Sequence, residues 1–486
     1  MSSPLLWTIA VAALFVPGAP CPAPPEWPAA LPASPAFRLD RRAFDADVRD
    51  AMRRWRVPGA AVVVVQGGRV EYLAGHGPGV TPDTIFPIAS CSKAFAVEAI
   101  ARLVAEGRMG WDDPVRRHLA GFRLFDPDAD SKVTLRDLLS HRTGVGSHDL
   151  LWYHAPWSPE DAVRRVQDLA PSKPFRTTRQ YQSTMFTAAG LAVARAEGKP
   201  WGDVLRDRFL VPLGMTRTSP TYPGDAVPNQ ARPHRLTRAG VEPMPRYPLD
   251  VPNPAGTMHS TARDLGAWLR SLLAGNPRRE MWTEQIEIVP TESQKPLFPA
   301  TRRHGYGLGW VVQDYHGLAL VSHGGAIDGF RAHIALIPSR RLGIAILTNL
   351  DQTPMPLPLA STLLDRILSL PPTDWHALHE AHQQRVADEA RQAMVRRFEG
   401  RPTDARSPRP LSAYAGTYRH PAYDDVTFVV RAGKLVCAWR GENAEAIHVR
   451  GEAFVLVSGL LGTADVVFTP TEAKIGGRLG VTMTRP

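Results

Sequence analysis

Two groups of predicted strands, far apart along the chain, constrain the fold of this sequence more than any other feature. The first is a hairpin at residues 60–75, where a β-branched run is followed by a Gly-Gly turn and a second short strand. The second group consists of four strand-like segments, GLGWVVQDY, LALVSHGG, RAHIALIPS and LGIAILTNL, between residues 307 and 350. This order predicts an α+β fold whose antiparallel sheet joins the two ends of a domain.

The residues between the two groups of strands are mostly helical by their pattern. An amphipathic helix at 43–57 precedes the hairpin and is stopped by Pro58-Gly59. The further predicted helices lie at residues 90–106, 133–145, 183–198, 260–275 and 374–400. The sequence therefore predicts an antiparallel sheet flanked by helices, together with a mostly helical subdomain.

Length and composition indicate a globular protein with more than one part. The chain has 486 residues, of which 44% are hydrophobic and 21% charged, and this length allows about two to four domains. Prolines cluster at 17–35 and 402–410, as is typical of linkers. After residue 411, short alternating strands with tight glycine turns predict a small all-β barrel or meander. The predicted parts are a leader (1–36), a main domain (37–370), a charged helix with a proline-rich linker (371–410) and a β domain (411–486).

The N-terminal apolar run LLWTIAVAALFVPGAP fits a signal peptide. It is shorter than the about 20 residues that a membrane span needs, and Pro17 interrupts it. We therefore expect an exported protein, periplasmic or extracellular, with no stable membrane span after signal removal. The alternative is a protein anchored in the membrane through this segment. If Cys21 leaves with the signal, Cys91 and Cys437 remain in different predicted domains, and no disulfide framework is expected.

The net charge of +10 is too diffuse to indicate a nucleic-acid partner. Lys and Arg number 57 against 47 Asp and Glu, which attracts anionic partners in general. No concentrated basic stretch with interleaved aromatic residues is present in the sequence, and the most basic part, 396–410, is typical of a solvated linker. A basic surface that faces an anionic cell envelope explains the charge equally well.

Ser90 and Lys93 are the first candidates for chemistry. They stand three residues apart at the predicted start of the 90–106 helix and so share one helix face. A serine at this end of a helix favours a nearby oxyanion, and a buried lysine with a lowered pKa can accept its proton. The same spacing also fits a capping serine beside a surface lysine, so the pair alone does not decide between the two interpretations.

Two later motifs favour catalysis. QYQSTMFTAAG carries Tyr181-Gln182-Ser183 just before a predicted helix, and VSHGGAIDGF carries His323-Gly324-Gly325 at the end of a predicted strand. With Ser90-x-x-Lys93 they occur in order, about 90 and 140 residues apart. In this arrangement they resemble the three motifs of the serine beta-lactamases and penicillin-binding proteins.

Other stretches strengthen the resemblance. TLRDLLSHRTGV, GRMGWDDPV, PAGTMHSTARDLGAWL and GYGLGW are each similar to a stretch of the same family, and together they cover roughly residues 37–370. The chain is identified as a member of the beta-lactamase-related serine hydrolases, which include class C beta-lactamases, D-alanyl-D-alanine carboxypeptidases, D-aminopeptidases, CubicO-type proteins and esterases. YAGTY at 414–418 resembles a small β domain appended to some members.

The resemblance implies a role for each motif residue. Ser90 would be the acylated nucleophile, and Lys93 would take its proton or hold the network that does. Tyr181 would share the base role and later pass a proton to the leaving group. His323 stands where many members have lysine; it would bind a substrate carboxylate when charged, or only hydrogen-bond when neutral.

The resemblance also implies a backbone site along the third motif. Gly324 and Gly325 would let the substrate lie along the strand edge. The backbone N–H groups of Ser90 and Ala326 would form the oxyanion hole, where each donor contributes about 3–4 kcal/mol in related chemistry. Ser183 departs from the pattern, because the second motif usually ends in asparagine. A serine has one hydroxyl where asparagine has an acceptor and two donors, which affects amide substrates more than esters.

No cofactor or metal is expected. His141, His148 and His154 match no metal-ligand spacing, and His141 is better explained as a brace for a helix end. Cys91 is expected in the packing, with a reactive thiol as the alternative. Ser92 lacks a lysine three residues on and is expected to be a bystander.

Aromatic residues between the first two motifs leave two interpretations open. Trp152, Tyr153 and Trp157 could form an aromatic wall for the substrate or belong to ordinary packing. The C-terminal β domain could bind a ligand, narrow the cleft or only stabilise the chain.

Three functions remain in competition at this point. The leading hypothesis is a serine hydrolase that acts through an acyl-enzyme on a small-molecule or short peptide substrate, whether an ester, a D-amino peptide or a lactam amide. The second is an acylable or inactive sensor of the penicillin-binding type, which Ser183 and His323 support. The third is a scaffold protein that assembles through its C-terminal domain. The sequence indicates no oligomeric state.

Overall fold

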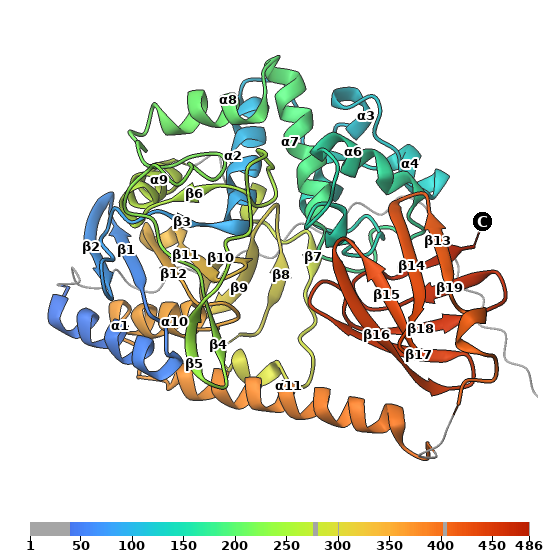
Figure 1. Ribbon diagram of the computed structural model, residues 1–486. Helices are drawn as coiled ribbons and strands as arrows, with labels where there is room; N and C mark the ends of the chain where they lie inside the picture. The colour runs from blue at the N-terminus through green and yellow to red at the C-terminus, as the bar shows by residue number, and fades with distance from the viewer. Residues whose placement is uncertain (1–38, 276–279, 300, 402–405, 486) are drawn as a thin grey trace, which may run out of the picture.

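The computed structural model describes residues 39–275, 280–299, 301–401 and 406–485 (Figure 1). The predicted leader, 1–36, lies outside the described residues, as does part of the predicted proline-rich linker. Within the described ranges, no helix is long and apolar enough to cross a membrane.

An eight-stranded antiparallel sheet forms the centre of the main domain, in the order β2-β1-β12-β11-β10-β9-β8-β7. Its strands are β1 Ala60–Gln66, β2 Arg69–His76, β7 Ile286–Glu287, β8 His304–Tyr306, β9 Val311–Tyr315, β10 Leu318–Ile327, β11 Phe330–Ile337 and β12 Leu342–Thr348. The first and last strands pair along their whole length, from Ala60 opposite Thr348 to Gln66 opposite Leu342. The prediction of an antiparallel sheet that joins both ends of the domain is therefore confirmed.

The apolar run in β1 reflects burial on both faces of the sheet. Ala61, Val63 and Val65 enter one hydrophobic core, whereas the alternate residues from Ala60 to Val64 enter a second core on the opposite face. Helix α9 contacts β1 and β12, while α10 contacts β11 and β12 and packs on α1. A strand covered in this way is apolar throughout rather than alternating, as the sequence shows.

Eleven α-helices lie within the described residues. They are α1 Arg41–Trp55, α2 Ser92–Ala105, α3 Val115–His118, α4 Pro127–Lys132, α5 Leu135–Leu139, α6 Pro159–Arg164, α7 Ser183–Glu197, α8 Trp201–Leu205, α9 Ala262–Ala274, α10 Pro356–Ile367 and α11 Trp375–Phe398. Helices α2 to α8 form the mostly helical part of the main domain at the top of Figure 1. Two small two-stranded sheets pair β3 Phe86–Pro87 with β6 His259–Ser260, and β4 His234–Thr237 with β5 Gly240–Pro243.

The prediction of a helix over residues 133–145 is wrong in the length of the helix. The observed α5 begins after the capping residue Thr134 and ends at Leu139, five residues later and well before Gly144. Its end is set by His141, which has φ 59° and thus leaves the right-handed helical region. The Ser140 hydroxyl donates to the Arg136 carbonyl oxygen at 2.7 Å and closes the last turn.

The C-terminal part is a closed eight-stranded barrel, which confirms the prediction of a small all-β barrel. Its strands are β13 Gly416–His420, β14 Tyr423–Arg431, β15 Lys434–Trp439, β16 Glu442–Arg450, β17 Ala453–Ser458, β18 Gly462–Phe468, β19 Glu472–Ile475 and β20 Val481–Thr484. The long helix α11 runs along one side of the main domain toward the barrel (Figure 1). The barrel packs on the main domain, where Arg440 Nη1 donates to the carbonyl oxygen of Leu150 at 2.8 Å.

Candidate active site

A strained turn presents Ser90 at the start of helix α2. Ala89 has φ +45°, a left-handed conformation that costs a non-glycine residue about 1–3 kcal/mol. The 3₁₀ turn Ala89–Cys91 leads directly into α2. Ser90 is partly exposed there, whereas Ser92 is buried and its hydroxyl donates to the Ala89 carbonyl oxygen at 2.7 Å. The Ser90 hydroxyl is therefore accessible to a reactant, whereas the Ser92 hydroxyl is used in a hydrogen bond to the backbone.

Lys93 is fully buried and is held by three oxygen atoms. Its Nζ lies 3.1 Å from Ser90 Oγ, 3.4 Å from Ser183 Oγ and 2.7 Å from the carbonyl oxygen of Ala255. Burial lowers the pKa of Lys93 to about 7, an effect that the charge of Asp149 partly opposes. Near neutral pH a large share of Lys93 is thus an uncharged amine within reach of the Ser90 hydroxyl.

Tyr181 completes the group around Ser90. Its side chain hydrogen-bonds with that of Ser90, and the Lys93 ammonium nitrogen lies 4.9 Å from the centre of its ring. Burial raises the pKa of Tyr181 well above its usual value of 10.0. The phenol therefore stays protonated near neutral pH, and Lys93 is the better candidate for the base.

His323 is neutral and fully engaged within the protein. Its Nδ1 lies 2.7 Å from the Gly324 carbonyl oxygen, which can only accept, so Nδ1 carries the proton. Its Nε2, 3.1 Å from the Tyr306 hydroxyl, is then the acceptor. Burial, together with the charge of Lys93, lowers the pKa of His323 to about 3. Of the two roles that the sequence left open, this geometry matches the neutral histidine and leaves no N–H for a substrate carboxylate.

The third motif forms an exposed strip of β10 beside the Ser90 turn. Gly324 and Ala326 are exposed, while Gly325 between them faces the turn and is buried. A Cβ atom at Gly325 would lie 2.1 Å from the carbonyl oxygen of Ile88, so no larger residue fits without a shift of the backbone. The strip thus approaches Ser90 closely and leaves two consecutive outward positions without bulky side chains.

Cys91 belongs to the packing between the turn and β10. Its side chain is completely buried, and its Sγ lies 3.5 Å from the carbonyl oxygen of His323. Burial raises the pKa of the Cys91 thiol to about 12. A thiol of this kind is mostly protonated at neutral pH and out of contact with solvent, which argues against a reactive cysteine.

Asn253 is a supporting residue that sequence reasoning missed. Its Oδ1 accepts hydrogen bonds from the Thr187 hydroxyl and from the Ala255 backbone N–H, both at 2.9 Å. These bonds fix the Ala255 backbone, whose carbonyl oxygen is the nearest partner of Lys93 Nζ. Because Ser183 holds Lys93 only at 3.4 Å, the Asn253–Ala255 loop contributes the shorter contact. The signal in the sequence was the position of Asn253 directly before the recognised stretch PAGTMHSTARDLGAWL.

His141 supports the second motif from behind. Its Nδ1 accepts a hydrogen bond from the Gln182 backbone N–H at 3.0 Å, and its ring lies 4.5 Å from that of Tyr181 between centres. Gln182 points away from Ser90, because its side chain bonds with Thr143 and the Val145 carbonyl oxygen. The His141 side chain therefore holds the Tyr181 segment, in addition to the place of His141 at the end of its own helix.

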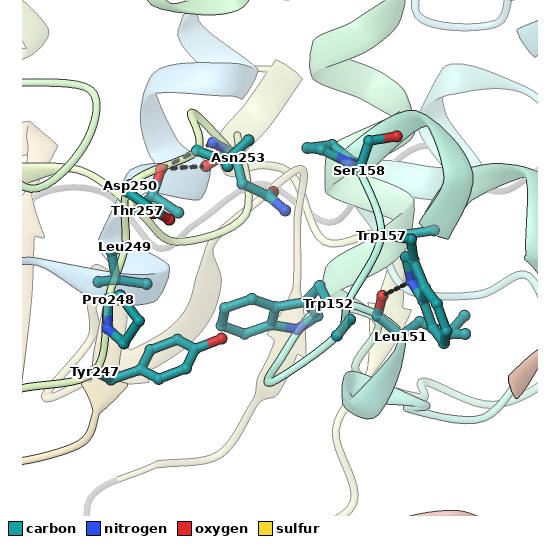
Figure 2. Close-up of a pocket in the computed structure, with 14 residues that line it drawn as sticks. Leu151, Trp152, Trp157, Ser158, Tyr247, Pro248, Leu249, Asp250, Asn253 and Thr257 are labelled. Carbon is teal, nitrogen blue, oxygen red and sulfur yellow. Dashed lines mark hydrogen bonds between the residues drawn. The ribbon is translucent and has the colours of Figure 1, made fainter. Parts of the chain in front are cut away.

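Two cavities adjoin the site on the side of residues 147–162. The larger, of about 510 Å³, is lined by Ala326, Asp149, Trp152 and Tyr153 from the main domain and by Arg478 from the barrel. The smaller, of about 100 Å³, lies between residues 151–162 and 247–257. Figure 2 shows the ring of Trp152 there, between Tyr247 and Trp157. Trp152 lines both cavities, which favours the interpretation of the aromatic residues as a wall beside the cleft.

The fold and the arrangement of Ser90, Lys93 and Tyr181 are typical of the beta-lactamase and penicillin-binding-protein class. The model of the beta-lactamase family matches residues 44–368. The chain is also 30% identical over 420 residues to unguisins hydrolase ungD' of Aspergillus campestris, covering 79% of this chain and 77% of the relative. It is 29% identical over 323 residues to penicillin-binding protein 4 of Amycolatopsis lactamdurans, covering 62% and 83%. The chain therefore belongs to the beta-lactamase family.

Solved structures show the same architecture. The octameric penicillin-binding protein homologue from Pyrococcus abyssi superposes with a TM-score of 0.62 at 20% identity, over 92% of this chain and 100% of that one. A match of this extent must include part of the C-terminal barrel. A D-stereospecific amidohydrolase from Streptomyces gives a TM-score of 0.55 at 25% identity, over 64% of this chain and 95% of that one.

Proposed function

We propose that this protein hydrolyses its substrate through an acyl-enzyme formed on Ser90. The observation that carries the proposal is the position of Lys93 Nζ, 3.1 Å from Ser90 Oγ in surroundings that lower its pKa to about 7. A neutral amine at this distance accepts the hydroxyl proton as Ser90 attacks the acyl carbon. Backbone N–H groups of Ser90 and Ala326 would stabilise the oxyanion that forms.

The proton then travels through Tyr181. The leaving group departs with a proton from the Tyr181 hydroxyl, which hydrogen-bonds with Ser90 and remains protonated at neutral pH. The Lys93 ammonium returns a proton to Tyr181 and becomes an amine again. In the second half of the reaction, water attacks the ester on Ser90 and its proton passes to the Lys93–Tyr181 pair. The pair then returns a proton to the Ser90 oxygen as the acid product leaves. Lys93 and Tyr181 act here as one coupled set.

The substrate class that we propose is a short peptide amide with a D-amino acid at the cleaved bond. Relatives named unguisins hydrolase, penicillin-binding protein and D-stereospecific amidohydrolase support an amide substrate. The cavity of about 510 Å³ beside Ala326 gives room for several groups of a small ligand. Ester hydrolysis and lactam opening are the alternatives within the same mechanism.

A substrate panel tests this function. D-alanyl anilides, short-chain nitrophenyl esters and a chromogenic cephalosporin are each offered to the wild type and to Ser90→Ala. We expect turnover of the anilide by the wild type and its loss in Ser90→Ala. Equal rates in the two proteins would overturn the assignment of Ser90 as the nucleophile. Turnover of the ester alone would overturn the proposal of an amide substrate.

One observation favours a second candidate, a penicillin-binding-type sensor. The Ser183 hydroxyl lies 3.4 Å from Lys93 Nζ and is the one group that Ser183 offers. Lys93, which must activate water for deacylation, is therefore held weakly by the second motif. A sensor would be acylated by a penicillin and keep the adduct for hours without turnover of any substrate in the panel. Release of the adduct within minutes would exclude this alternative.

A further inference from the structure

Ser183 gives Lys93 only a long contact on the side of the second motif. The motif usually ends in asparagine, whose side-chain oxygen accepts a hydrogen bond more readily from a fixed direction than a rotating hydroxyl does. The Ser183 hydroxyl lies 3.4 Å from Lys93 Nζ, beyond the usual distance for a hydrogen bond of this kind. The carbonyl oxygen of Ala255 lies at 2.7 Å. The closest acceptor for Lys93 therefore comes from the backbone of another segment.

Asn253 fixes that backbone to the helix of the second motif. Its Oδ1 accepts hydrogen bonds from the Ala255 N–H and from the Thr187 hydroxyl, both at 2.9 Å. Thr187 follows Ser183 by four residues on α7, about one helical turn. The Asn253 side chain is buried and belongs to the wall of the smaller cavity (Figure 2). Through this side chain the Ala255 peptide is tied to the same helix that Ser183 begins.

The loop that carries Ala255 is also packed between two elements of the site. On one side, a Cβ atom at Gly190 of α7 would lie 2.0 Å from Cγ of Pro254. On the other side, the Met258 carbonyl oxygen accepts from the N–H of Ile88, just before the Ser90 turn, at 2.9 Å. These contacts place the loop as a whole, whereas the bond from Asn253 acts on the Ala255 peptide itself.

The direction of the Ala255 carbonyl group matters for the transfer of the proton. A carbonyl oxygen can only accept, so it must take an N–H of the Lys93 amine. A neutral amine has a single lone pair, and this lone pair has to receive the proton of Ser90. An N–H that is held toward Ala255 turns the lone pair toward the hydroxyls. Of these, Ser90 Oγ is the nearer, at 3.1 Å.

We infer that Asn253 is a positioning residue for the Lys93 base and takes over the task of the asparagine that the second motif lacks. The inference rests on the proposed function, because it uses Lys93 as the base. Asn253 acts through the Ala255 carbonyl oxygen, whereas an asparagine at position 183 would act on Lys93 directly. The two positions then substitute for each other, so the loss of Asn253 matters less when position 183 carries the asparagine.

A double-mutant cycle between positions 253 and 183 tests the inference. The measurement is the second-order rate of labelling by a fluorophosphonate at pH 8, in the wild-type chain and in Ser183→Asn. We expect Asn253→Ala to slow labelling about tenfold in the wild-type chain, which corresponds to about 1.4 kcal/mol. In the Ser183→Asn chain the same change should slow labelling less than about threefold, because contacting groups are not additive. Thr187→Val, which removes one of the two bonds to Asn253, should show a smaller loss with the same dependence on position 183.

Urea unfolding separates the positioning role from a purely structural one. Asn253→Ala should lower the unfolding midpoint equally in both chains, because an asparagine at position 183 does not restore the bond to the Ala255 N–H. The rate, by contrast, should recover in the Ser183→Asn chain. Asn443→Ala is the matched control, since Asn443 is exposed on the barrel and its loss should leave the labelling rate unchanged in both chains.

Two results would overturn the inference. One is the same fold-loss of the labelling rate by Asn253→Ala in both chains, which would show that the two positions act independently. The other is an unchanged rate in Asn253→Ala of the wild-type chain. Failure of the proposed function is a separate result, since it is read from Lys93→Ala: labelling at the wild-type rate in that variant would remove Lys93 as the base.

Discussion

Lys93 combines two properties at the residue scale that rarely occur together. It is completely buried, yet no carboxylate of the described residues contacts its nitrogen; its partners there are two hydroxyls and one carbonyl oxygen. Because the only opposing charges act without contact, burial outweighs the charge of Asp149 and lowers the pKa of Lys93 to about 7. A paired lysine would keep its proton at neutral pH and could not serve as a base.

The lowered pKa predicts how the acylation rate depends on pH. Below about pH 7 Lys93 is protonated and cannot accept the Ser90 proton, so the rate should rise as the pH increases through about 7 and then level off. The measurement is the second-order rate of labelling by a fluorophosphonate between pH 5.5 and 9. Lys93→Arg, whose guanidinium stays charged, should react about 10²-fold to 10⁴-fold more slowly throughout. A rate independent of pH in the wild type would contradict the role of Lys93.

Gly325 sets the distance between two elements, the Ser90 turn and strand β10. A Cβ atom there would meet the carbonyl oxygen of Ile88 at 2.1 Å, whereas one at Gly324 would find its nearest neighbour at 3.9 Å. The two adjacent glycines therefore have different functions, although the sequence presents them as one motif. Gly325 allows the turn to pack against the strand. Gly324 leaves the exposed face of strand β10 without a protruding side chain.

This difference predicts unequal effects of two similar variants. Gly325→Ala should lower the free energy of unfolding by about 1–3 kcal/mol, as overpacking does, and slow labelling of Ser90 because the turn must move. Gly324→Ala should change the free energy of unfolding by less than about 0.5 kcal/mol. Urea unfolding and fluorophosphonate labelling measure both effects. Equal destabilisation by the two variants would show that the close approach at Gly325 is not the cause.

Patterns along the chain predicted the helices and strands well, but they predicted the contacts between these elements less well. The β1–β2 hairpin and helix α7 follow from local signals, a Gly-Gly turn and an apolar period ending at glycine. The left-handed residues Ala89 and His141 carry no local signal, because neither is a glycine and tertiary contacts hold both. For this reason the early end of helix α5 and the strained Ser90 turn were not predicted.

The same limit applies to the candidate site. Ser90, Lys93, Tyr181 and His323 belong to spaced motifs, and the structure brings them together. Asn253 acts through the Ala255 carbonyl oxygen, which no spacing reveals. The neutral state of His323 depends on its burial against Tyr306, so the sequence could only leave both charge states open.

For the whole molecule, the barrel forms part of the cleft rather than a separate module. Arg440 is almost completely buried, pairs with Asp424 at 2.8 Å and donates to the Leu150 carbonyl oxygen. His148, in the same segment of the main domain, bonds with the Tyr423 hydroxyl at 2.9 Å. Arg478 of the barrel lines the same cavity as Ala326. Of the roles considered for this domain, narrowing the cleft is the one that these contacts favour.

The Arg440 contact predicts an effect on substrate binding at a distance from Ser90. Arg440→Ala leaves Asp424 without its cation and frees the segment that lines the larger cavity, so the KM of the best panel substrate should rise several-fold. The melting temperature should fall as well, since a hydrogen-bonded charge at an interface is lost. Arg431→Ala is the control, because Arg431 is exposed on the same barrel and its side chain bonds, within the described part of the chain, only with that of Asn443. A lower melting temperature with an unchanged KM would assign the barrel to stability alone.

The central claim, that Ser90 is the nucleophile and Lys93 its base, is tested most directly by locating the covalent adduct. The protein is treated with a fluorophosphonate at pH 8, its intact mass is measured, and the modified peptide is sequenced by fragmentation. We predict one adduct per chain, on Ser90, absent from Ser90→Ala and present in Ser92→Ala. An adduct on Ser92 or elsewhere, or labelling of Ser90→Ala at the wild-type rate, would contradict the account.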